Sequence, residues 1–303
     1  MPVAIFDMDG VLYRGDTVMP YAREALARLR AGGWQVFFAT NNSSASREDY
    51  VGRLTRMGLG GDAEHVITSA YATAHYLERL DPQPRDVFVV GADGLRNEIQ
   101  AVGIPVRARA DQPGRQPPPE AALDGKANAS AMRAYLVGLE LPPTPDTVVV
   151  GLDLHLTYAA LAEAQRGLLA GARFIASNKD RAYPVEGRLL PGAGSIVRAL
   201  EVASEREAVC IGKPEPWLFA EAIRRAGSQT GQETGQQAGP VVVIGDAPEY
   251  DIVAAHRVNA TGVLITTGLT EADAVARATG EAVPDHVIDS LDELFALPEL
   301  AGL

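Results

Sequence analysis

The sequence is poor in cysteine and in positive charge, and it has no long apolar run. Its one cysteine, Cys210, excludes an internal disulfide and fits a reducing compartment. The 27 basic residues stand against 39 acidic ones, and a net charge of −12 disfavours nucleic acid or an anionic membrane surface as the main partner. No apolar stretch approaches the ~18 residues of a membrane span, and no basic segment followed by an apolar one opens the chain. We therefore expect a cytoplasmic protein in which a site for an anion needs locally supplied positive charge.

Short apolar runs alternate with amphipathic patterns along the 303 residues. The runs are continuous, as in strands covered on both faces, and this favours a parallel α/β fold. The predicted strands are 3–6, 36–39, 66–68, 87–90, 148–151, 174–176, 208–211, 241–244 and 261–265. The predicted helices, with apolar residues three and four apart, are 21–31, 47–57, 70–80, 158–169, 194–203, 217–226 and 251–258. So many elements in a chain of this length predict two domains.

The segment 81–177 has strand and helix patterns of its own, and we expect it to be an inserted domain. It includes a proline- and alanine-rich connection, 108–124, that we expect to be poorly ordered. A polar, low-complexity run at 228–239 is predicted to be a surface loop. The main domain then consists of 1–80 and 178–303.

The first predicted strand ends in two carboxylates one residue apart, Asp7 and Asp9, followed by Gly10. Alternate strand residues share a face, so both carboxylates can project to one side, and Gly10 permits the bend that follows. Two close carboxylates repel each other, and the remedies are a shared proton or a hard divalent cation. The pattern predicts either a perturbed acid pair or a metal site, and a turn that caps a helix is the non-functional alternative.

Three further groups of polar residues follow predicted strands. The hydroxyl- and amide-bearing segment 40–43 precedes a helix, whose N-terminus favours an anion, although helix capping alone would explain it. Lys213 lies between a strand and two prolines and supplies the local positive charge that this acidic chain needs at an anion site, unless it is an ordinary solvated lysine. Asp246 and Asp251 follow another strand and are candidates to complete a magnesium site; turn aspartates are the alternative. All four groups at strand ends favour a functional site, because ligands of open α/β sheets bind there.

In chain order, these groups resemble the four motifs of the haloacid dehalogenase-like phosphatase superfamily. The matching segments are Asp7-Met-Asp-Gly-Val-Leu, Ala39-Thr-Asn-Asn-Ser, Gly212-Lys-Pro, and Gly245-Asp with Asp251. More narrowly, the chain is similar to the NagD and p-nitrophenyl phosphatase branch, in Thr40-Asn-Asn-Ser, Val150-Gly-Leu-Asp, 172–180, Leu190-Pro-Gly-Ala-Gly and Ile211-Gly-Lys-Pro-Glu-Pro. It departs from the family in the proline-rich stretch 113–119 and in Ala247-Pro-Glu-Tyr, where Glu249 and Asp251 keep the acidity.

The resemblance implies a doubly wound, Rossmann-like parallel sheet as the catalytic core, formed by 1–80 and 178–303. It implies a smaller α/β cap domain at 81–177. It also implies a phosphomonoesterase that uses Mg²⁺ as its cofactor.

Asp7 is then expected to be the nucleophile, which forms an aspartyl phosphate, and Asp9 to be the general acid and base. The resemblance places Mg²⁺ on the Asp7 carboxylate, the Asp9 backbone carbonyl and Asp246. Asp251 is expected to anchor a metal-bound water. The metal reading of the acid pair thus replaces the shared-proton reading.

The phosphoryl oxygens are expected to be held by Thr40, by the backbone amide of Asn41 and by Lys213. Contacts to the rest of the substrate are expected from side chains near the strand ends and from the loop that leaves the cap. The residues predicted to bind substrate are Gly10, Asn41, Asn42, Ser43, Asn178, Asp180 and Lys213.

A cap implies a small phosphorylated metabolite as substrate, because a closing lid excludes folded proteins and duplex nucleic acid. Members of the branch act on nucleoside monophosphates, phosphoglycolate, pyridoxal phosphate, sugar phosphates and p-nitrophenyl phosphate, and commonly form homodimers through the cap. Three alternatives stay open. They are a phosphotransferase or mutase with the same nucleophile, a carbon–halogen hydrolase that needs no magnesium, and a non-catalytic phosphometabolite-binding protein.

Overall fold

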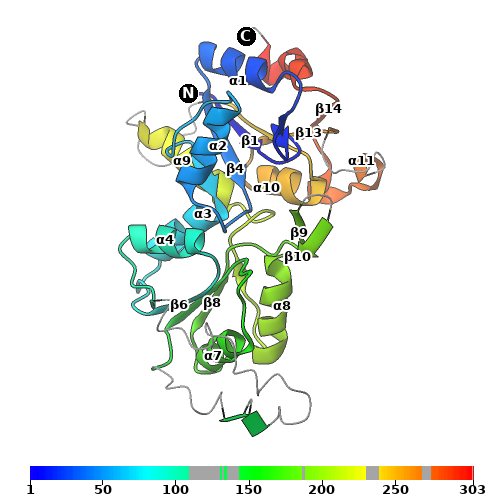
Figure 1. The fold of residues 1–303 in the computed structure, drawn as a ribbon. Helices are drawn as coiled ribbons and strands as arrows, with labels where there is room; N and C mark the ends of the chain where they lie inside the picture. Colours follow the sequence, from blue (N-terminus) through cyan, green and yellow to red (C-terminus); the bar gives the residue numbers. More distant parts are fainter. Residues whose placement is uncertain are drawn as a thin grey trace. The chain divides into compact units, whose positions relative to one another are not determined.

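The structure is a computed structural model that describes residues 1–108, 130–131, 133–134, 143–185, 188–229, 239–267, 274–301 and 303. It divides into two compact units (Figure 1). The first is formed by Met1–Ala72 together with Ile211–Leu303, and the second by Thr73–Cys210. Most of the expected connection 108–124 and of the expected surface loop 228–239 lies outside the described residues.

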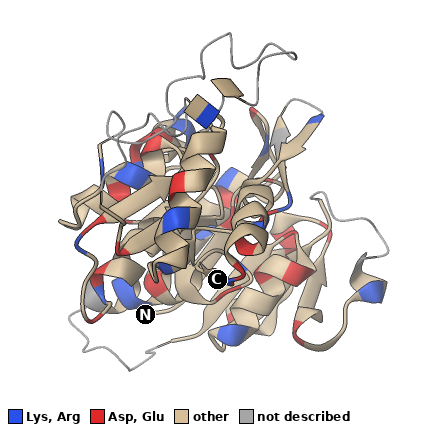
Figure 2. Cartoon of the chain, turned by 90° about the horizontal axis from the view of Figure 1, so that it is seen from below, with Lys and Arg blue, Asp and Glu red and all other residues tan. Residues whose placement is uncertain are grey.

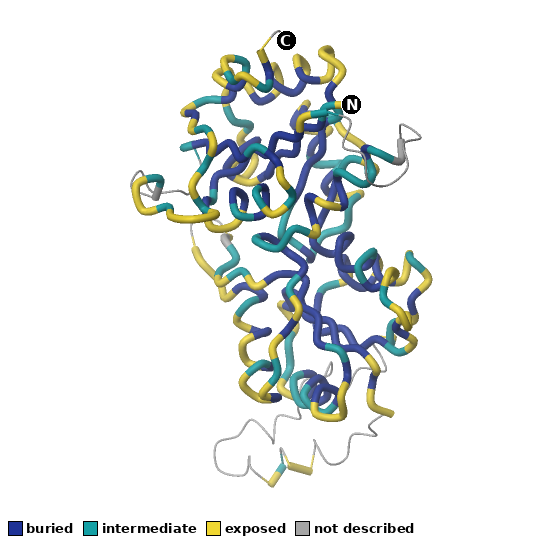
Figure 3. Tube along the Cα trace, turned by 180° about the vertical axis from the view of Figure 1, so that it is seen from behind, coloured by how far each residue is buried: buried dark blue, intermediate teal, exposed yellow. Residues whose placement is uncertain are grey.

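The first unit contains a six-stranded parallel sheet in the order β14-β13-β12-β1-β4-β5. Its strands are β1 (Val3–Asp7), β4 (Gln35–Thr40), β5 (Val66–Thr68), β12 (Val241–Gly245), β13 (Thr261–Ile265) and β14 (His286–Ile288). They are rich in buried valine, isoleucine and phenylalanine, as strands covered on both faces require, and the buried trace runs through them in Figure 3. The chain adds strands on one side of β1 and later on the other, so the sheet is doubly wound and its order reverses beside β1.

Helices cover both faces of this sheet. On one face, Phe6 and Phe38 of the sheet share a core with Leu26 of α1 (Ala22–Ala31) and Leu54 of α2 (Arg47–Arg56). Helix α2 begins at a capping box, in which the Ser46 side chain and Asp49 bond each other's backbone amides. Helix α9 (Trp217–Gln229) contacts β1, β4 and β5 and contributes none of its residues to that core, so it lies on the other face.

The remaining elements of the first unit are short. A hairpin of β2 (Tyr13–Arg14) and β3 (Thr17–Val18) follows β1. A π-helix (Pro248–Ile252) runs into α10 (Val253–Arg257) after β12. The chain then forms α11 (Ala274–Arg277) and the 3₁₀ turns Gly280–Ala282, Leu291–Ala296 and Pro298–Leu300. Helix α3 (Ser69–Glu78) begins in the first unit and continues into the second.

The second unit is built on a four-stranded sheet in the order β11-β8-β7-β6, all parallel. The strands are β6 (Val87–Val90), β7 (Thr147–Val150), β8 (Arg173–Ala176) and β11 (Val209–Cys210), and the helices are α4 (Asp93–Ala101), α7 (Tyr158–Leu169) and α8 (Ala193–Ser204). Leu168 of α7 and Val197 of α8 pack on Val148 and Phe174 of this sheet. An antiparallel hairpin of β9 (Ala182–Val185) and β10 (Arg188–Pro191) precedes α8.

The second unit begins before and ends after the predicted inserted segment 81–177. Residues 178–210, which the sequence analysis assigned to the catalytic core, lie within it. The physical reason is long-range pairing: β11 adds to the edge of this sheet, with Val209 opposite Ile175, and α8 packs beside α7. Neither contact is visible in local sequence patterns.

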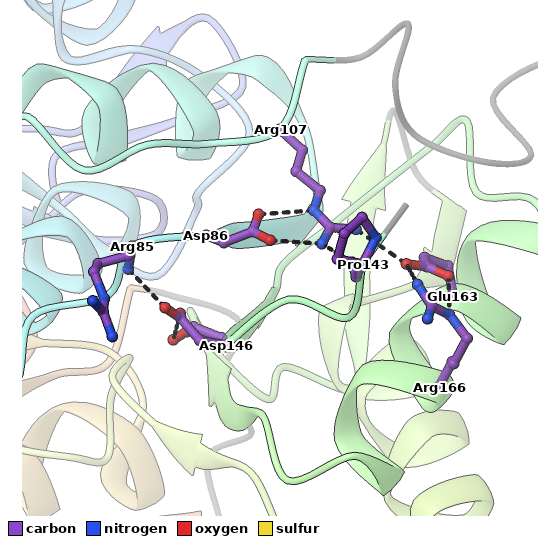
Figure 4. Close-up of polar contacts among 8 residues, drawn as sticks. Arg85, Asp86, Arg107, Pro143, Asp146, Glu163 and Arg166 are labelled. Atoms are coloured by element: carbon purple, nitrogen blue, oxygen red, sulfur yellow. Dashed lines mark hydrogen bonds and ion pairs between the residues drawn. The ribbon is translucent and has the colours of Figure 1, made fainter. Parts of the chain in front are cut away.

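An ion-pair network in the second unit joins residues on the two sides of a gap in the described chain (Figure 4). The guanidinium of Arg107 bonds both carboxylate oxygens of Asp86, at 2.8 and 2.7 Å, and Oε1 of Glu163 at 3.1 Å. It also donates to the carbonyl of Pro143. The buried Glu163 is bonded in addition by Arg166. The network therefore holds the chain at Arg107 against the chain at Pro143, across a gap in the described residues.

The predicted α/β fold is confirmed, and each predicted strand has a counterpart within one or two residues at its ends. Both hairpins, the short strand β14 and the helices α4 and α11 were not predicted from the sequence. The predicted helix 251–258 is shorter than expected, because its first part is a π-helix. Among the described residues, no helix is both long and apolar enough to cross a bilayer.

Candidate active site

Four predicted groups of residues meet at one edge of the first unit's sheet. Asp7 is the last residue of β1, Thr40 is the last of β4, and Asp246 follows the last residue of β12. The strands are parallel and in register, with Asp7 beside Ala39 and Phe6 beside Ile244, so their carboxyl ends lie together. This edge lies where the strand order reverses, the place where open α/β sheets bind ligands.

Lys213 is the centre of this group. Its Nζ donates to Oδ1 of Asp7 at 2.5 Å and to Oδ1 of Asp251 at 2.6 Å, and all three side chains are buried. Burial alone would lower the pKa of Lys213, but the charges of Asp251 and Asp7 outweigh it and raise the pKa above its ordinary value. Lys213 is therefore a fixed positive charge beside two carboxylates.

Asp7, Asp246 and Asp251 form a buried carboxylate cluster, in which one oxygen from each lies within 4.8 Å of the others. Burial raises the pKa of Asp7 well above its usual value; Lys213 opposes this rise, and the neighbouring Asp251 and Asp246 add to it. One lysine does not balance three carboxylates. Oxygen ligands with excess negative charge are what Mg²⁺ prefers, so the cluster fits that ion.

The backbone around Asp251 explains how the third carboxylate reaches the cluster. Asp251 lies in the π-helix, a geometry often found at functional sites, and its Oδ2 accepts a bond from the Ala247 amide at 3.1 Å. A Cβ added at Gly245 would lie 2.2 Å from Cβ of Asp251. Glycine at the end of β12 is therefore required for this close approach. Glu249, the other acidic candidate, is exposed and is not part of the cluster.

Asn41 fixes the backbone of Lys213. Its Oδ1 accepts from the Lys213 amide at 2.7 Å, and its Nδ2 donates to the Lys213 carbonyl at 3.1 Å. From the sequence, only the backbone amide of Asn41 was expected to bind phosphate. The side chain joins the second and third predicted groups, which are far apart in the sequence.

The segment after β4 is a tight turn held by its own side chains. The amide of Asn42 donates to Oγ1 of Thr40 at 3.2 Å, and Oδ1 of Asn42 accepts from the amide and hydroxyl of Ser44 at 2.8 and 2.7 Å. Ser43 is buried beneath the turn. Thr40 and Asn41 therefore lie at the sheet edge in a loop held by its own hydrogen bonds, and the side-chain oxygen of Asn42 helps to shape the turn.

Asp9 and Gly10 lie in the turn that follows β1. Gly10 has φ of 90°, a conformation that favours glycine, and its amide donates to the carbonyl of Tyr13 at 2.8 Å. The Asp9 side chain is exposed and outside the carboxylate cluster. Displacement of water by the surrounding protein raises the pKa of Asp9, and the charges of Arg53 and Arg14 oppose this. An acid with a raised pKa at the edge of the site suits proton transfer.

Asn178 and Asp180 belong to the second unit. There they form a turn, in which Oδ1 of Asn178 accepts from the amide of Asp180 at 3.1 Å. Their expected place beside Asp7 stays a prediction.

One residue of the site was missed by the sequence analysis. Ser69, the first residue of α3, is fully buried, and its hydroxyl donates to the carbonyl of Asn41 at 2.5 Å. Strand β5 pairs with β4 so that Thr68 lies opposite Thr40. This register brings together the residues that follow the two strands, Ser69 and Asn41. In the sequence, a serine that follows a strand is typical of any helix N-terminus. Ser69 is therefore recognised as part of the site only from the register of β5 on β4.

Comparisons with known proteins agree with this geometry. A family model described as haloacid dehalogenase-like hydrolase matches residues 4–105, and a second haloacid dehalogenase hydrolase-like model matches 210–294. The glycerol-3-phosphate phosphatase of Gallus gallus is 34% identical over 96% of this chain and 90% of its own. The solved glycerol phosphate phosphatase of Mycobacterium tuberculosis in complex with magnesium is 28% identical, with a TM-score of 0.76 over 96% of this chain and 75% of its own. The solved p-nitrophenyl phosphatase of Archaeoglobus fulgidus is 27% identical, with a TM-score of 0.76 over 97% of this chain and 98% of its own.

Proposed function

Because the chain belongs to the haloacid dehalogenase-like hydrolase family, in the branch of the NagD and p-nitrophenyl phosphatases, we propose that its site hydrolyses a small phosphomonoester through an aspartyl phosphate on Asp7. The enzyme is a magnesium-dependent phosphatase. The assignment of roles to single residues is our proposal.

One observation carries this proposal. Asp7 is buried, bonded by a buried lysine, and placed in a three-carboxylate cluster at the switch point of the sheet. A structural salt bridge needs neither the two additional carboxylates nor the glycine that lets Asp251 approach. A nucleophile that must meet an anionic phosphate needs both the positive charge and a cation ligand set.

In the first step, a carboxylate oxygen of Asp7 forms a bond to phosphorus while the bond to the leaving oxygen breaks. Asp9 gives its proton to that leaving oxygen, for which a raised pKa is favourable. In the second step, Asp9 takes a proton from water as the water attacks phosphorus. The bond between phosphorus and the Asp7 oxygen breaks, so the carboxylate of Asp7 is regenerated and inorganic phosphate is released.

Charge that spreads over the phosphoryl oxygens in both steps is stabilised by fixed donors. Lys213 supplies a buried positive charge, and Thr40 and the Asn41 amide supply hydrogen bonds from the turn after β4. Asp7, Asp246 and the Asp9 carbonyl would hold Mg²⁺, with Asp251 beside them. When bound there, the ion would screen the repulsion between the Asp7 carboxylate and the phosphate.

We further propose that the second unit is the cap and selects the leaving group. Every residue that is proposed to take part in the chemical steps lies in the first unit. The second unit can therefore differ in sequence between enzymes without altering the chemistry. Gly10, Asn42 and Ser43 of the first unit and Asn178 and Asp180 of the second are the proposed substrate contacts. Single alanine substitutions at Asn178 and Asp180 are expected to change KM and the order of preferred substrates more than kcat.

The first experiment is a panel of phosphomonoesters assayed with and without Mg²⁺ and scored by kcat/KM. The panel contains glycerol 3-phosphate, nucleoside monophosphates, phosphoglycolate, pyridoxal phosphate, sugar phosphates and p-nitrophenyl phosphate. Phosphate release that a chelator abolishes and Mg²⁺ restores supports the proposal. Activity on haloacids in the presence of chelator would instead identify a carbon–halogen hydrolase.

Phosphate transfer to an added alcohol or sugar in place of water would identify a phosphotransferase. Tight binding of a panel member with no turnover would identify a phosphometabolite-binding protein.

For partners, we propose a small metabolite rather than nucleic acid or a membrane, as the net charge of −12 favours. Basic and acidic residues are interspersed along the elements of Figure 2. A homodimer through the cap and a cytoplasmic location are proposed on the resemblance and on the single cysteine, Cys210.

A further inference from the structure

We propose that Ser69 is a positioning residue for the phosphatase reaction, which acts through the peptide group between Asn41 and Asn42 to make the Thr40 hydroxyl a hydrogen-bond donor to the phosphoryl group. The inference rests on the proposed function and adds a residue that contacts neither substrate nor metal. It starts from two hydrogen bonds made by the same peptide group.

The first bond fixes the carbonyl side of that peptide. The Ser69 hydroxyl donates to the carbonyl oxygen of Asn41 at 2.5 Å. Ser69 is fully buried, and removal of its hydroxyl takes this donor away from the Asn41 carbonyl.

The second bond leaves from the amide side. The Asn42 N–H, which belongs to the same peptide group, donates to Oγ1 of Thr40 at 3.2 Å. Since Oγ1 accepts this bond, the proton of the Thr40 hydroxyl cannot point toward Asn42. The hydroxyl is thereby oriented to donate in another direction.

The two bonds form a chain with one polarity, from the Ser69 hydroxyl through the peptide to the Thr40 hydroxyl. Hydrogen bonds in such a chain polarise one another, and a hydroxyl that accepts a bond becomes a better donor. Thr40 ends β4 beside β1, the strand that carries Asp7, so its improved donor strength is available where phosphoryl charge develops. The register of β5 on β4, with Thr68 opposite Thr40, brings Ser69 to its place in this chain.

A purely structural role for Ser69, at the start of α3, is the competing explanation. The neighbouring Thr68 provides a matched control, because it is also fully buried and its Oγ1 accepts from the Tyr71 amide at 3.0 Å in the same first turn of α3. Thr68→Val therefore disturbs the start of α3 and leaves the bonds of the peptide between Asn41 and Asn42 in place.

The test is a double-mutant cycle between Ser69→Ala and Thr40→Val, with kcat and KM measured on the best phosphomonoester of the panel. Loss of one direct donor costs ~10²–10³ in kcat. We expect Ser69→Ala to have a smaller effect, a loss of about tenfold in kcat with little change in KM. Ser69→Thr keeps the hydroxyl and is expected to restore most of the lost kcat. In the Thr40→Val background, Ser69→Ala is expected to cost less than about twofold, since residues acting through one group are not additive.

Thr68→Val is expected to lower the melting temperature and to leave kcat close to that of wild type, because the bond it removes is to the Tyr71 amide and not to the peptide between Asn41 and Asn42. Equal costs of Ser69→Ala in the two backgrounds, or a kcat that Thr68→Val lowers as much as Ser69→Ala does, would overturn the role of Ser69. A wild-type protein that hydrolyses no phosphomonoester overturns the proposed function and this inference together. An active wild type with an additive cycle overturns only the inference.

Discussion

The side chain of Asn41 bonds both backbone groups of Lys213, with its oxygen on the amide and its nitrogen on the carbonyl. The position of the lysine ammonium between Asp7 and Asp251 therefore depends on a residue 172 positions earlier in the chain. Positioning by a paired amide is sensitive to the chemistry of both ends, and this makes it testable.

Replacement of Asn41 by leucine is expected to lower kcat/KM by about 10²-fold, because a displacement of about 1 Å in a catalytic group has that effect. It also leaves two backbone groups of Lys213 without partners, at a cost of roughly 1–3 kcal/mol each if they stay buried. Asn41→Asp keeps the acceptor and loses the donor, so an intermediate loss is expected. Steady-state kinetics and thermal melts measure both effects, and a leucine variant with wild-type kcat/KM would contradict the positioning role.

Asp7→Asn is expected to abolish turnover while leaving the fold intact. Lys213 keeps its bond to Asp251, so the buried ammonium still has an anionic partner. Loss of a covalent nucleophile costs about 10⁶ in kcat in a serine protease, and a similar loss is expected here. Circular dichroism and a melt comparable to wild type are the controls. Substantial activity at saturating Mg²⁺ would exclude Asp7 as the nucleophile.

Asp9→Asn is expected to separate the two chemical steps. p-Nitrophenolate leaves without a proton, so the aspartyl phosphate should form and then hydrolyse slowly, since no base activates the water. A stoichiometric burst of p-nitrophenolate followed by turnover about 10²–10⁴-fold slower than wild type is the expected result in stopped flow. If Asp9 only shapes the turn, the variant will show no burst.

Gly245→Ala tests the metal cluster without removing a carboxylate. The added Cβ would lie 2.2 Å from Cβ of Asp251, so the π-helix must shift and the cluster must open. We expect a destabilisation of about 1–3 kcal/mol and a higher Mg²⁺ concentration for half-maximal activity. Gly227→Ala in α9 is the matched control, because its Cβ would meet nothing within 4 Å and alanine stabilises such helix positions by about 0.4–1 kcal/mol. A normal Mg²⁺ dependence in Gly245→Ala would mean that Asp251 does not help to hold the ion.

Asp285 gives a pH-dependent contribution to stability away from the site. Its burial opposes ionisation, but the Gly262 amide, which donates to it at 2.7 Å, and the bond to His256 outweigh this and lower the pKa of Asp285. A lowered folded-state pKa stabilises the fold above the unfolded-state pKa of ~3.9, and this stabilisation is lost as the pH falls through the folded-state value. Asp285→Asn should therefore be less stable than wild type in urea at neutral pH, and the difference should shrink below about pH 4. A difference that is constant with pH would contradict this account.

The sequence predicted the sheet, and it predicted that most of the candidate site residues gather at one edge of it, because both depend on local signals. An apolar run that ends in Asp7, Thr40 or Asp246 marks a strand and its functional end together, and parallel strands must gather those ends at one edge. Asp7 and Lys213 could be named as candidate functional residues from their positions at strand ends, before any distance between them was known.

What the sequence did not reveal depends on strand pairing between distant segments. Ser69 reaches Asn41 only through the register of β5 on β4, and the side-chain role of Asn41 depends on the loop of Lys213 far along the chain. The extent of the second unit was likewise set by the pairing of β11 with β8, which two residues, Val209 and Cys210, carry. Local periodicity holds no information on these contacts.

The central position of β1 also determines the order in which the site is completed during synthesis. Asp7, the proposed nucleophile, is among the first residues made, but its neighbour β12 and the partners Lys213 and Asp251 follow only after the whole second unit. A nascent chain therefore has an incomplete sheet and isolated acidic residues until its last third emerges. The candidate site is completed only when Lys213, Asp246 and Asp251 have been made. Such sequence-distant pairing makes folding slow. Products truncated before Lys213 lack that lysine as well as Asp246 and Asp251, and we expect them to be inert toward phosphate esters.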